Sequence, residues 1–226
     1  MLQTTSGFDR LLRVGRSFSC GRETIVERWC EGSRLHSGEL FAIDDLGSSV
    51  QIAWHLQLAG DDMHSSPSIG ADGTIYVGTD RGLFAVRDDG GSGQLLPGWP
   101  VPVAGDIDTV PSISNGKVFV SSHQSGTRTL YAIATGNPPT ILWQVSGPGS
   151  TTTSFAQTPS AVIGANGLVY AAIGNDVYAF DPARAQPANA VWQHALPGDV
   201  ISLALGDGVL YVSAKNNRLY ALVPGA

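Results

Sequence analysis

Charge is scarce in this chain of 226 residues. Only 14% of the residues are charged, and 13 lysines and arginines against 19 aspartates and glutamates leave a net charge of −6. A surface that binds nucleic acid needs clustered positive charge, so we expect no nucleic-acid partner. Apolar runs are short, and none approaches the roughly 18 residues of a membrane-spanning helix. The N-terminus lacks the charged start, apolar stretch and small-residue cleavage site of a secretory signal, so none is predicted.

Cysteine is also nearly absent. The two cysteines, Cys20 and Cys30, both lie in the first 36 residues. They would form a disulfide in an oxidising compartment and remain thiols elsewhere, and the sequence leaves both alternatives open. Residues 1–36 hold six arginines and four acidic residues, whereas residues 37–226 hold seven basic and fifteen acidic residues. We therefore predict a divergent N-terminal segment, residues 1–36, followed by a repeat region, residues 37–226.

Tryptophan, in contrast, recurs at a regular interval. Trp54, Trp99, Trp143 and Trp192 are separated by 45, 44 and 49 residues. Each is followed by a small or apolar stretch, then by a turn with a second strand, and then by a third strand. A period of this length indicates a repeat architecture. The short runs rich in Val, Ile, Tyr and Thr indicate strands rather than helices.

Each repeat carries a hairpin turn at the same place. The four turn dipeptides are Asp72-Gly73, Asn115-Gly116, Asn166-Gly167 and Asp207-Gly208. Asp or Asn followed by Gly supplies the positive φ angles of tight hairpins. The sequence thus predicts an all-β fold, a β-propeller made of four-stranded blades of about 45 residues each.

The number of blades depends on how the last repeat is completed. That repeat ends with a third strand at Leu222 and Val223 and has no tryptophan-bearing strand after it. We predict five blades, closed into a ring by an N-terminal strand, FDRLLRV (8–14), that pairs with the last blade. The N-terminal segment would then be a degenerate first blade, with SFSC (17–20) as its inner strand and TIVERWC (24–30) as its second. The alternative is an open fragment of a larger propeller, whose exposed ends would favour a homo-oligomer.

One segment of the repeat region resembles a known family. AIDDLGSSVQIAW, from Ala42 to Trp54, is similar to the repeat of proteins related to pyrroloquinoline quinone (PQQ) dehydrogenases, in which Ala-x-Asp leads through a glycine-containing turn to a strand with tryptophan. AFDPARAQPANAVW (179–192) keeps the aspartate but has a longer turn without the glycine. The resemblance covers residues 37–226, and the repeat also occurs in outer-membrane assembly lipoproteins. It implies that each tryptophan packs between neighbouring blades, and that the protein is periplasmic or extracellular.

The resemblance does not extend to the quinone site. The quinone enzymes of the family use two adjacent cysteines in a ring-like disulfide, and a Ca²⁺ ion held by Glu, Asn and Asp. This chain has no adjacent cysteine pair and is shorter than those enzymes, which use more blades. A quinone-dependent dehydrogenase is therefore the weakest hypothesis. We expect neither PQQ nor another resident cofactor, with Ca²⁺ as the one alternative.

Two sets of loops are expected on one face, beside the central channel. Loops that lead from an outer strand to the next inner strand contain Asp61, Asp62, His64, Asp106, Asp108 and Asp199. Loops between second and third strands contain Arg81, His123, Lys215 and Asn217. Gly-Asp before a strand is a common turn in which the carboxylate accepts backbone hydrogen bonds. Alternatively, carboxylates that recur at one repeat position form a polar ring that binds a ligand or Ca²⁺, although no compact metal motif is present.

We predict a non-catalytic scaffold that binds a protein, peptide or glycan through this face. Its ligand-binding residues would be Asp61, Asp106, Asp199, Arg81, Lys215 and Asn217.

The alternative from another class is a hydrolase of ester, phosphoester or glycoside bonds. His64 and His123 would be its acid-base groups, and Asp62 or Asp108 would orient one of them. Ser65 or Ser154 would be the nucleophile. The sequence has neither Gly-x-Ser-x-Gly nor His-Glu-x-x-His, so no motif supports this alternative.

Overall fold

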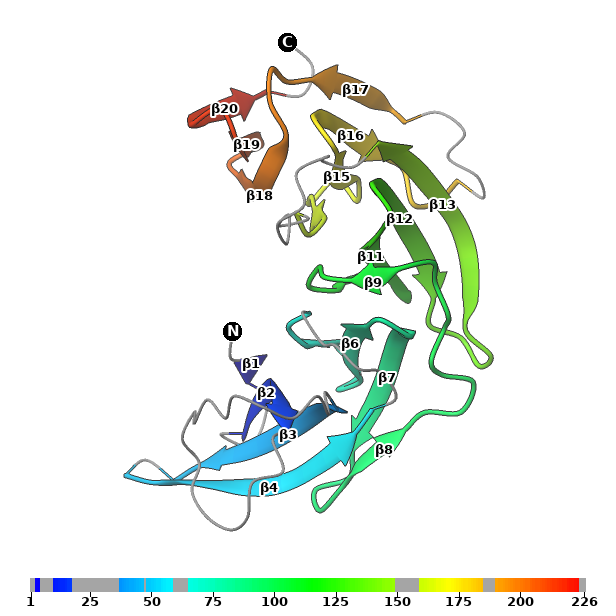
Figure 1. The fold of residues 1–226 in the computed structure, drawn as a ribbon, viewed down its shortest axis with the longest axis vertical. Helices are drawn as coiled ribbons and strands as arrows, with labels where there is room; N and C mark the ends of the chain where they lie inside the picture. Colours follow the sequence, from blue (N-terminus) through cyan, green and yellow to red (C-terminus); the bar gives the residue numbers. More distant parts are fainter. Residues whose placement is uncertain are drawn as a thin grey trace.

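The protein is built from strands and turns in the part of the chain that the structure describes. The structure, a computed structural model, describes residues 3–4, 10–17, 37–46, 48–58, 65–148, 159–184 and 190–223. In these residues twenty strands form five antiparallel sheets that follow one another along an open arc (Figure 1). The all-β prediction and the repeated sheets of a propeller are confirmed. None of the described segments is a helix of the length and apolarity needed to cross a membrane.

The five sheets follow the order of the repeats in the sequence. The first contains β1 (Gln3–Thr4), β2 (Arg10–Ser17), β3 (Ser37–Asp45) and β4 (Val50–Gln57). The second contains β5 (Ser68–Ile69), β6 (Ile75–Thr79), β7 (Gly82–Asp88) and β8 (Gly93–Leu95). The third contains β9 (Asp106–Ile107), β10 (Ser112–Ser114), β11 (Lys117–Gln124), β12 (Thr127–Ala134) and β13 (Thr140–Pro148). The fourth contains β14 (Val162–Ile163), β15 (Val169–Ile173), β16 (Asp176–Phe180) and β17 (Trp192–Ala195). The fifth contains β18 (Val200–Gly206), β19 (Val209–Ala214) and β20 (Arg218–Leu222).

The predicted turn dipeptides adopt the expected backbone. Asn115 and Gly116 both have positive φ, at 49° and 69°, and so do Asp207 and Gly208, at 51° and 76°. In the other two turns only the glycine does, Gly73 at 81° and Gly167 at 79°. Left-handed backbone of this kind matches the twist of the paired strands, which is why these dipeptides mark the hairpins.

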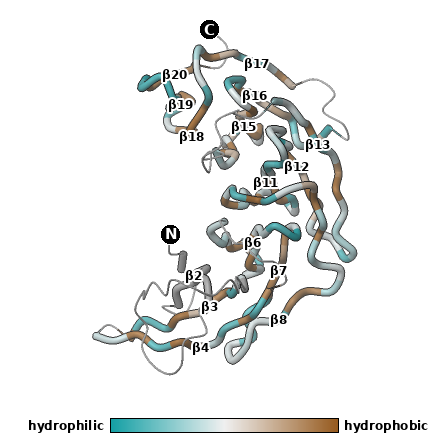
Figure 2. The backbone as a smooth tube through the Cα atoms, in the orientation of Figure 1, coloured by the Kyte–Doolittle hydropathy of each residue, from teal (hydrophilic) through white to brown (hydrophobic). Residues whose placement is uncertain are grey.

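The hydrophobic core lies between sheets rather than inside any one of them. The third strands of the five repeats are β3, β7, β12, β16 and β20. Alternate residues of each strand point to opposite faces of its sheet, because the side-chain period of a strand is two. We call the face toward the following sheet the forward face and the other the backward face. In the third sheet, Leu130 and Ala132 lie on the forward face and pack with the fourth sheet, whereas Tyr131 and Ile133 lie on the backward face and pack with the second. Figure 2 shows such hydrophobic stretches, in brown, on strands including β7 and β18.

The recurring tryptophans occupy these cores, as the family resemblance implied. Trp143 is only 5% exposed, and its ring lies 6.0 Å from that of Phe119 and 5.6 Å from that of Phe180 in the next sheet. Trp54 and Trp99 are likewise buried in the first and second of the four cores. Trp192 is half-buried in the fourth, 5.8 Å from the ring of Tyr170.

Trp99 departs from the pattern in one respect. Trp54, Trp143 and Trp192 lie in outer strands, but Trp99 follows the short strand β8. Pro97, Pro100 and Pro102 surround it, and proline has no N–H to donate to a strand partner. The strand therefore stops early, and a single bridge between Val101 and Leu83 continues the pairing.

The prediction that an N-terminal strand pairs with the last blade and closes the ring was wrong. Residues 10–14 of FDRLLRV belong to β2, which pairs with β3 over its whole length, from Arg10 opposite Asp44 to Ser17 opposite Ser37. Within the described residues, β20 pairs only with β19, and the first and fifth sheets lie at opposite ends of the arc (Figure 1). Strands that are neighbours along the chain usually pair with each other, and β2 follows this rule. The five sheets therefore have the open arrangement that was the alternative prediction (Figure 1). The expected strand TIVERWC, residues 18–20 of SFSC and both cysteines lie outside the described residues.

Trp143→Ala is expected to be strongly destabilising, because it removes a ring that joins the third and fourth sheets. Loss of a buried tryptophan costs about 3–5 kcal/mol. Trp192→Ala, which deletes the same side chain from a half-buried position, should cost clearly less. Urea unfolding followed by circular dichroism measures both losses, and equal losses would contradict the role assigned to Trp143.

Candidate functional site

The described residues contain eight of the predicted site residues, one of which, Ser65, precedes β5. Asp106, Asp108 and His123 belong to the third sheet or its approach, Arg81 lies in the turn between β6 and β7, and Asp199, Lys215 and Asn217 lie beside the strands of the fifth sheet. Asp61, Asp62, His64 and Ser154 lie outside the described residues. The hydrolase hypothesis, which needs several of those side chains, stays a prediction.

The segment that approaches the third sheet is more ordered than a loop. Asp106 and Ile107 form β9, in which Asp106 lies opposite His123 of β11. The next residues are fixed by Thr109, whose Oγ1 accepts a hydrogen bond from the Ser121 amide at 2.9 Å and donates to the Ser121 carbonyl at 3.2 Å. This pairing leaves Asp106 exposed and Asp108 half-buried.

Serine side chains link the inner segments of neighbouring sheets. The Ser65 hydroxyl is buried and donates to the Thr109 carbonyl at 2.8 Å, which joins the second sheet to the third. The Val110 amide donates to Ser160 Oγ at 2.9 Å, which joins the third to the fourth. The Ser65 hydroxyl is therefore part of the connection between sheets.

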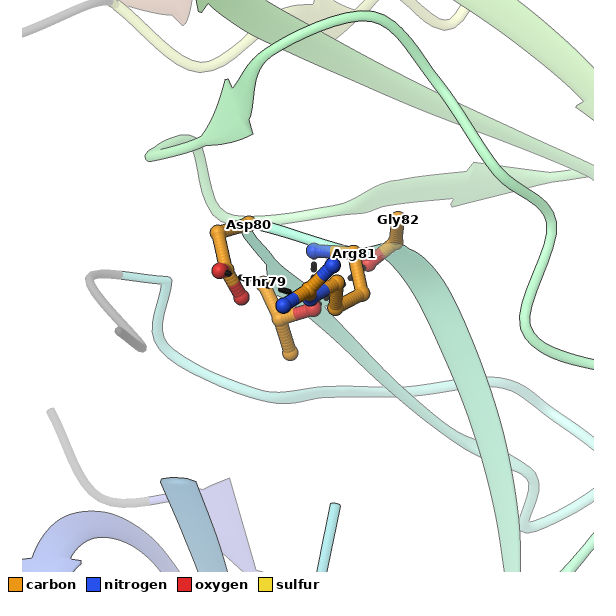
Figure 3. Close-up of polar contacts among 4 residues, drawn as sticks. All are labelled: Thr79, Asp80, Arg81 and Gly82. Atoms are coloured by element: carbon orange, nitrogen blue, oxygen red, sulfur yellow. Dashed lines mark hydrogen bonds and ion pairs between the residues drawn. The ribbon is translucent and has the colours of Figure 1, made fainter. Parts of the chain in front are cut away.

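Arg81 is presented to solvent by a rigid turn (Figure 3). Thr79 Oγ1 accepts a hydrogen bond from the Arg81 amide at 2.9 Å and donates to the Gly82 carbonyl at 3.3 Å. Gly82 has a φ of 127°, and a Cβ there would lie 2.2 Å from the Val101 carbonyl oxygen. The Arg81 side chain is 62% exposed, with Nε 3.7 Å from Asp80 Oδ2. An ion pair so exposed contributes at most about 1 kcal/mol, so the charge of Arg81 remains available to a ligand.

A second arginine, Arg128, stands at the same position of the next repeat. Arg81 comes two residues before Leu83, and Arg128 comes two residues before the corresponding Leu130. The hairpin of the third sheet is longer, with pairing that extends to Gln124 and Thr127, so Arg128 lies within β12. It is 1% exposed, the largest of the fully buried side chains among the described residues. Sequence reasoning missed Arg128, although an alignment of the repeats on Leu83 and Leu130 would have found it.

The environment of Arg128 is unfavourable for a charge. Burial lowers the pKa of its guanidinium, and the carboxylates of Asp199 and Asp108 act in the opposite direction by raising it. Nε and Nη1 have no hydrogen-bond partner in the part of the chain that the structure describes. Donors that are buried without acceptors cost free energy, and charged donors cost the most.

Charges of the third and fifth sheets both act on the pKa of this guanidinium. Asp199, which acts on Arg128, also receives Lys215, whose Nζ lies 3.5 Å from Asp199 Oδ2. The Lys215 amide donates to the Asp199 carbonyl at 2.9 Å, which fixes the turn between β19 and β20 against the start of β18. We call Asp108, Arg128, Asp199 and Lys215 the Arg128 cluster. It contains three of the residues expected on the ligand-binding face or in the hydrolase site, together with Arg128.

Asn217, in contrast, has a turn function. It has a φ of 61°, and its amide donates to the Ala214 carbonyl at 3.1 Å. Asparagine tolerates left-handed backbone better than most residues, which accounts for its presence here.

Metal binding was the remaining alternative for the acidic loops. Among the described residues, no group of three or more His, Cys, Asp or Glu side chains is placed to hold a metal ion. The predicted carboxylate ring includes Asp61 and Asp62, which are not described, so the Ca²⁺ alternative stays a prediction.

Solved structures with a similar fold come from several sources. BamB from Moraxella catarrhalis is 19% identical, with a TM-score of 0.58 over 80% of this chain and 52% of that one. Sqt1 from Saccharomyces cerevisiae is 14% identical, with a TM-score of 0.61 over 84% of this chain and 54% of that one. The computationally designed Ika8 protein is 12% identical, with a TM-score of 0.61 over 98% of this chain and 70% of that one. At these identities the likeness shows the fold alone.

The sequence comparison identifies the family. No curated protein matches the sequence. The family described as outer membrane protein assembly factor BamB matches residues 36–221, most of the chain and nearly all of the predicted repeat region. The chain spans about half the length of the BamB structure from Moraxella catarrhalis. The chain belongs to this family of PQQ-like repeat propellers.

Proposed function

We propose that the protein is a non-catalytic scaffold that binds a segment of a partner protein at the Arg128 cluster. The observation that carries the proposal is the buried guanidinium of Arg128, whose Nε and Nη1 lack hydrogen-bond acceptors among the described residues. Because Arg128 is 1% exposed, a partner carboxylate reaches it only if the segments that cover it move aside. The carboxylate would then supply acceptors, and charge-assisted hydrogen bonds of this kind are about twice as strong as neutral ones. Lys215 and Arg81 add positive charge in the loops between the second and third strands of their repeats. The segment we propose therefore carries an acidic side chain or a free C-terminus.

A buried charge kept at a cost to stability supports a binding function over a purely structural one. The lowered pKa of Arg128 means that folding disfavours its charged form, and burial is the largest cause. Groups with shifted pKa values concentrate at functional sites, although structural ion pairs shift pKa values too. The two explanations differ in what replacement of Arg128 does to stability and to binding.

The family suggests where such a partner is found. The family's description names assembly of outer-membrane proteins, so we propose a partner among the outer-membrane proteins or their assembly machinery, and a periplasmic location. A glycan ligand is the alternative that the test below separates from a protein segment.

Arg128→Met is expected to stabilise the protein. Methionine fills much of the same volume without a charge, and it removes buried donors that lack acceptors, each of which costs about 1 kcal/mol or more. Because the pKa of Arg128 is lowered by folding, its positive charge opposes folding at every pH below that pKa. The midpoint of urea unfolding at neutral pH measures the change. A loss of stability comparable to a core truncation would show instead that Arg128 is a structural ion-pair residue.

The same variant is expected to bind its partner more weakly. The probe is a fluorescently labelled outer-membrane β-barrel protein, unfolded in urea and diluted into buffer, with binding followed by fluorescence anisotropy. Buried arginines at binding hot spots contribute 2 kcal/mol or more, so Arg128→Met should weaken binding by about tenfold or more. Arg87→Met, which removes an exposed arginine from β7, is the matched control and should bind like the wild type.

Three results of the binding experiment would contradict the proposal. They are absence of binding by the wild type, equal binding by Arg128→Met, and binding of oligosaccharides in place of the unfolded protein. Turnover of ester, phosphoester or glycoside substrates that is lost in His123→Ala would contradict the non-catalytic assignment and favour the hydrolase.

A further inference from the structure

The fifth sheet ends the arc with an apolar forward face. In the third strands the residues at equivalent positions are LFAI (40–43), LFAV (83–86), LYAI (130–133), VYAF (177–180) and LYAL (219–222). The first and third letters of each point to the forward face, and the second and fourth to the backward face. In the fifth sheet Leu219 and Ala221 of β20 therefore point forward, beside Tyr211 of β19, which lies opposite Ala221.

These three residues are exposed where their counterparts are buried. Tyr211 is 40% exposed, whereas Tyr76, Phe119 and Tyr170 at the equivalent position are at most 3% exposed. Leu219 is 72% exposed, whereas Leu40, Leu83, Leu130 and Val177 are completely buried. The fifth sheet thus repeats residues that elsewhere form one half of an interface between sheets. Burial of an apolar surface of this kind is the main favourable term in association.

The other half of that interface recurs at the opposite end of the arc. Backward-face residues such as Phe84, Val86 and Ile133 are at most 1% exposed because a preceding sheet covers them. Phe41 and Ile43, their counterparts in the first sheet, are only half-buried. The ring of Phe41 stacks on His55 of its own sheet, at 6.0 Å. The first and fifth sheets therefore carry complementary halves of a contact that the described residues make four times between neighbouring sheets.

We propose that the forward face of the fifth sheet is a docking surface for the first sheet of a second copy of this chain, in a head-to-tail arrangement. The proposed contact continues the internal interfaces, in which a forward face packs on a backward face and never on another forward face. A contact between two different faces is heterologous, so it produces a closed ring or an open chain of copies.

The contact should be weaker than the internal ones. In the first, third and fourth sheets a tryptophan lies opposite the forward alanine, but no described residue supplies one opposite Ala221 on the outer side of β20. We therefore expect association to depend on protein concentration. The proposal is independent of the Arg128 cluster, and either can fail without the other.

Sedimentation equilibrium of the purified chain over a wide range of concentration tests the proposal. The wild type is expected to rise above the monomer mass of 23.6 kDa as concentration increases. Leu219→Asp and Tyr211→Asp, which place a carboxylate on the forward face, should weaken association by about tenfold or more. Leu95→Asp changes an exposed leucine of β8 outside this face and should associate like the wild type.

A second set of variants tests the head-to-tail arrangement. Phe41→Asp, or Ile43→Lys as a second variant of the same face, should weaken self-association as Leu219→Asp does. A mixture of Leu219→Asp and Phe41→Asp chains retains one intact pair of faces, so it should form dimers that neither variant forms alone. Far-UV circular dichroism and thermal melting establish that each variant is folded.

Several outcomes would overturn the proposal. A wild type that stays at 23.6 kDa throughout would overturn it, as would a Leu219→Asp chain that associates like the wild type. Association unaffected by both Phe41→Asp and Ile43→Lys would overturn the head-to-tail arrangement. A monomer that instead binds an added peptide with the sequence of residues 190–196, which contains Trp192, would assign the site to a strand at the edge of β20.

Discussion

The structure depends on the burial of apolar side chains between neighbouring sheets. Strands alternate their side chains, and in this protein both faces of a sheet are apolar, so each sheet needs a neighbour on each side. The third strands show this most clearly, because residues such as Leu130 and Ile133, three positions apart, enter different cores. The tryptophans enlarge these contacts, and serine hydroxyls such as that of Ser65 join the sheets at their inner ends. Stability therefore arises from contacts between repeats, which is typical of repeat proteins.

Because both faces of each sheet must be buried, only certain parts of the chain are left for function. Strand residues are committed to the cores, so variable chemistry is left to the turns and to the approaches to each sheet. Arg81 and Arg128 illustrate how a repeat position is adapted. A tight turn exposes Arg81 to solvent, whereas a longer hairpin draws Arg128 into the interior near the carboxylates of Asp108 and Asp199. A charge buried in this way is an exception to the apolar interior, and it is therefore the feature on which we base the proposed function.

Much of the fold followed from local patterns, whereas the long-range partners did not. Asn115-Gly116 requires a tight turn wherever it occurs, and a tryptophan repeated at this interval requires equivalent surroundings, so strands and repeats were predictable. The partner of residues 10–14 was not predictable, because alternating side chains can pair with any free strand edge. These residues pair in the first sheet rather than the last. Arg128 was missed because the length of one hairpin decides whether a polar residue is exposed or buried. Asp199 and Lys215 were placed in different loops, and their contact at 3.5 Å came only from the structure.

Contacts between sheets hold each sheet in place, and among the described residues the first and fifth sheets each have such contacts on one face alone. Amide hydrogen exchange of the wild-type chain, followed by mass spectrometry, tests this most directly. We expect β11, β12, β15 and β16 to be the most protected strands, and β19 and β20 to exchange faster in dilute solution and to gain protection as the protein is concentrated. Uniform protection of all five sheets at every concentration would show instead that contacts between sheets do not determine the stability of each sheet.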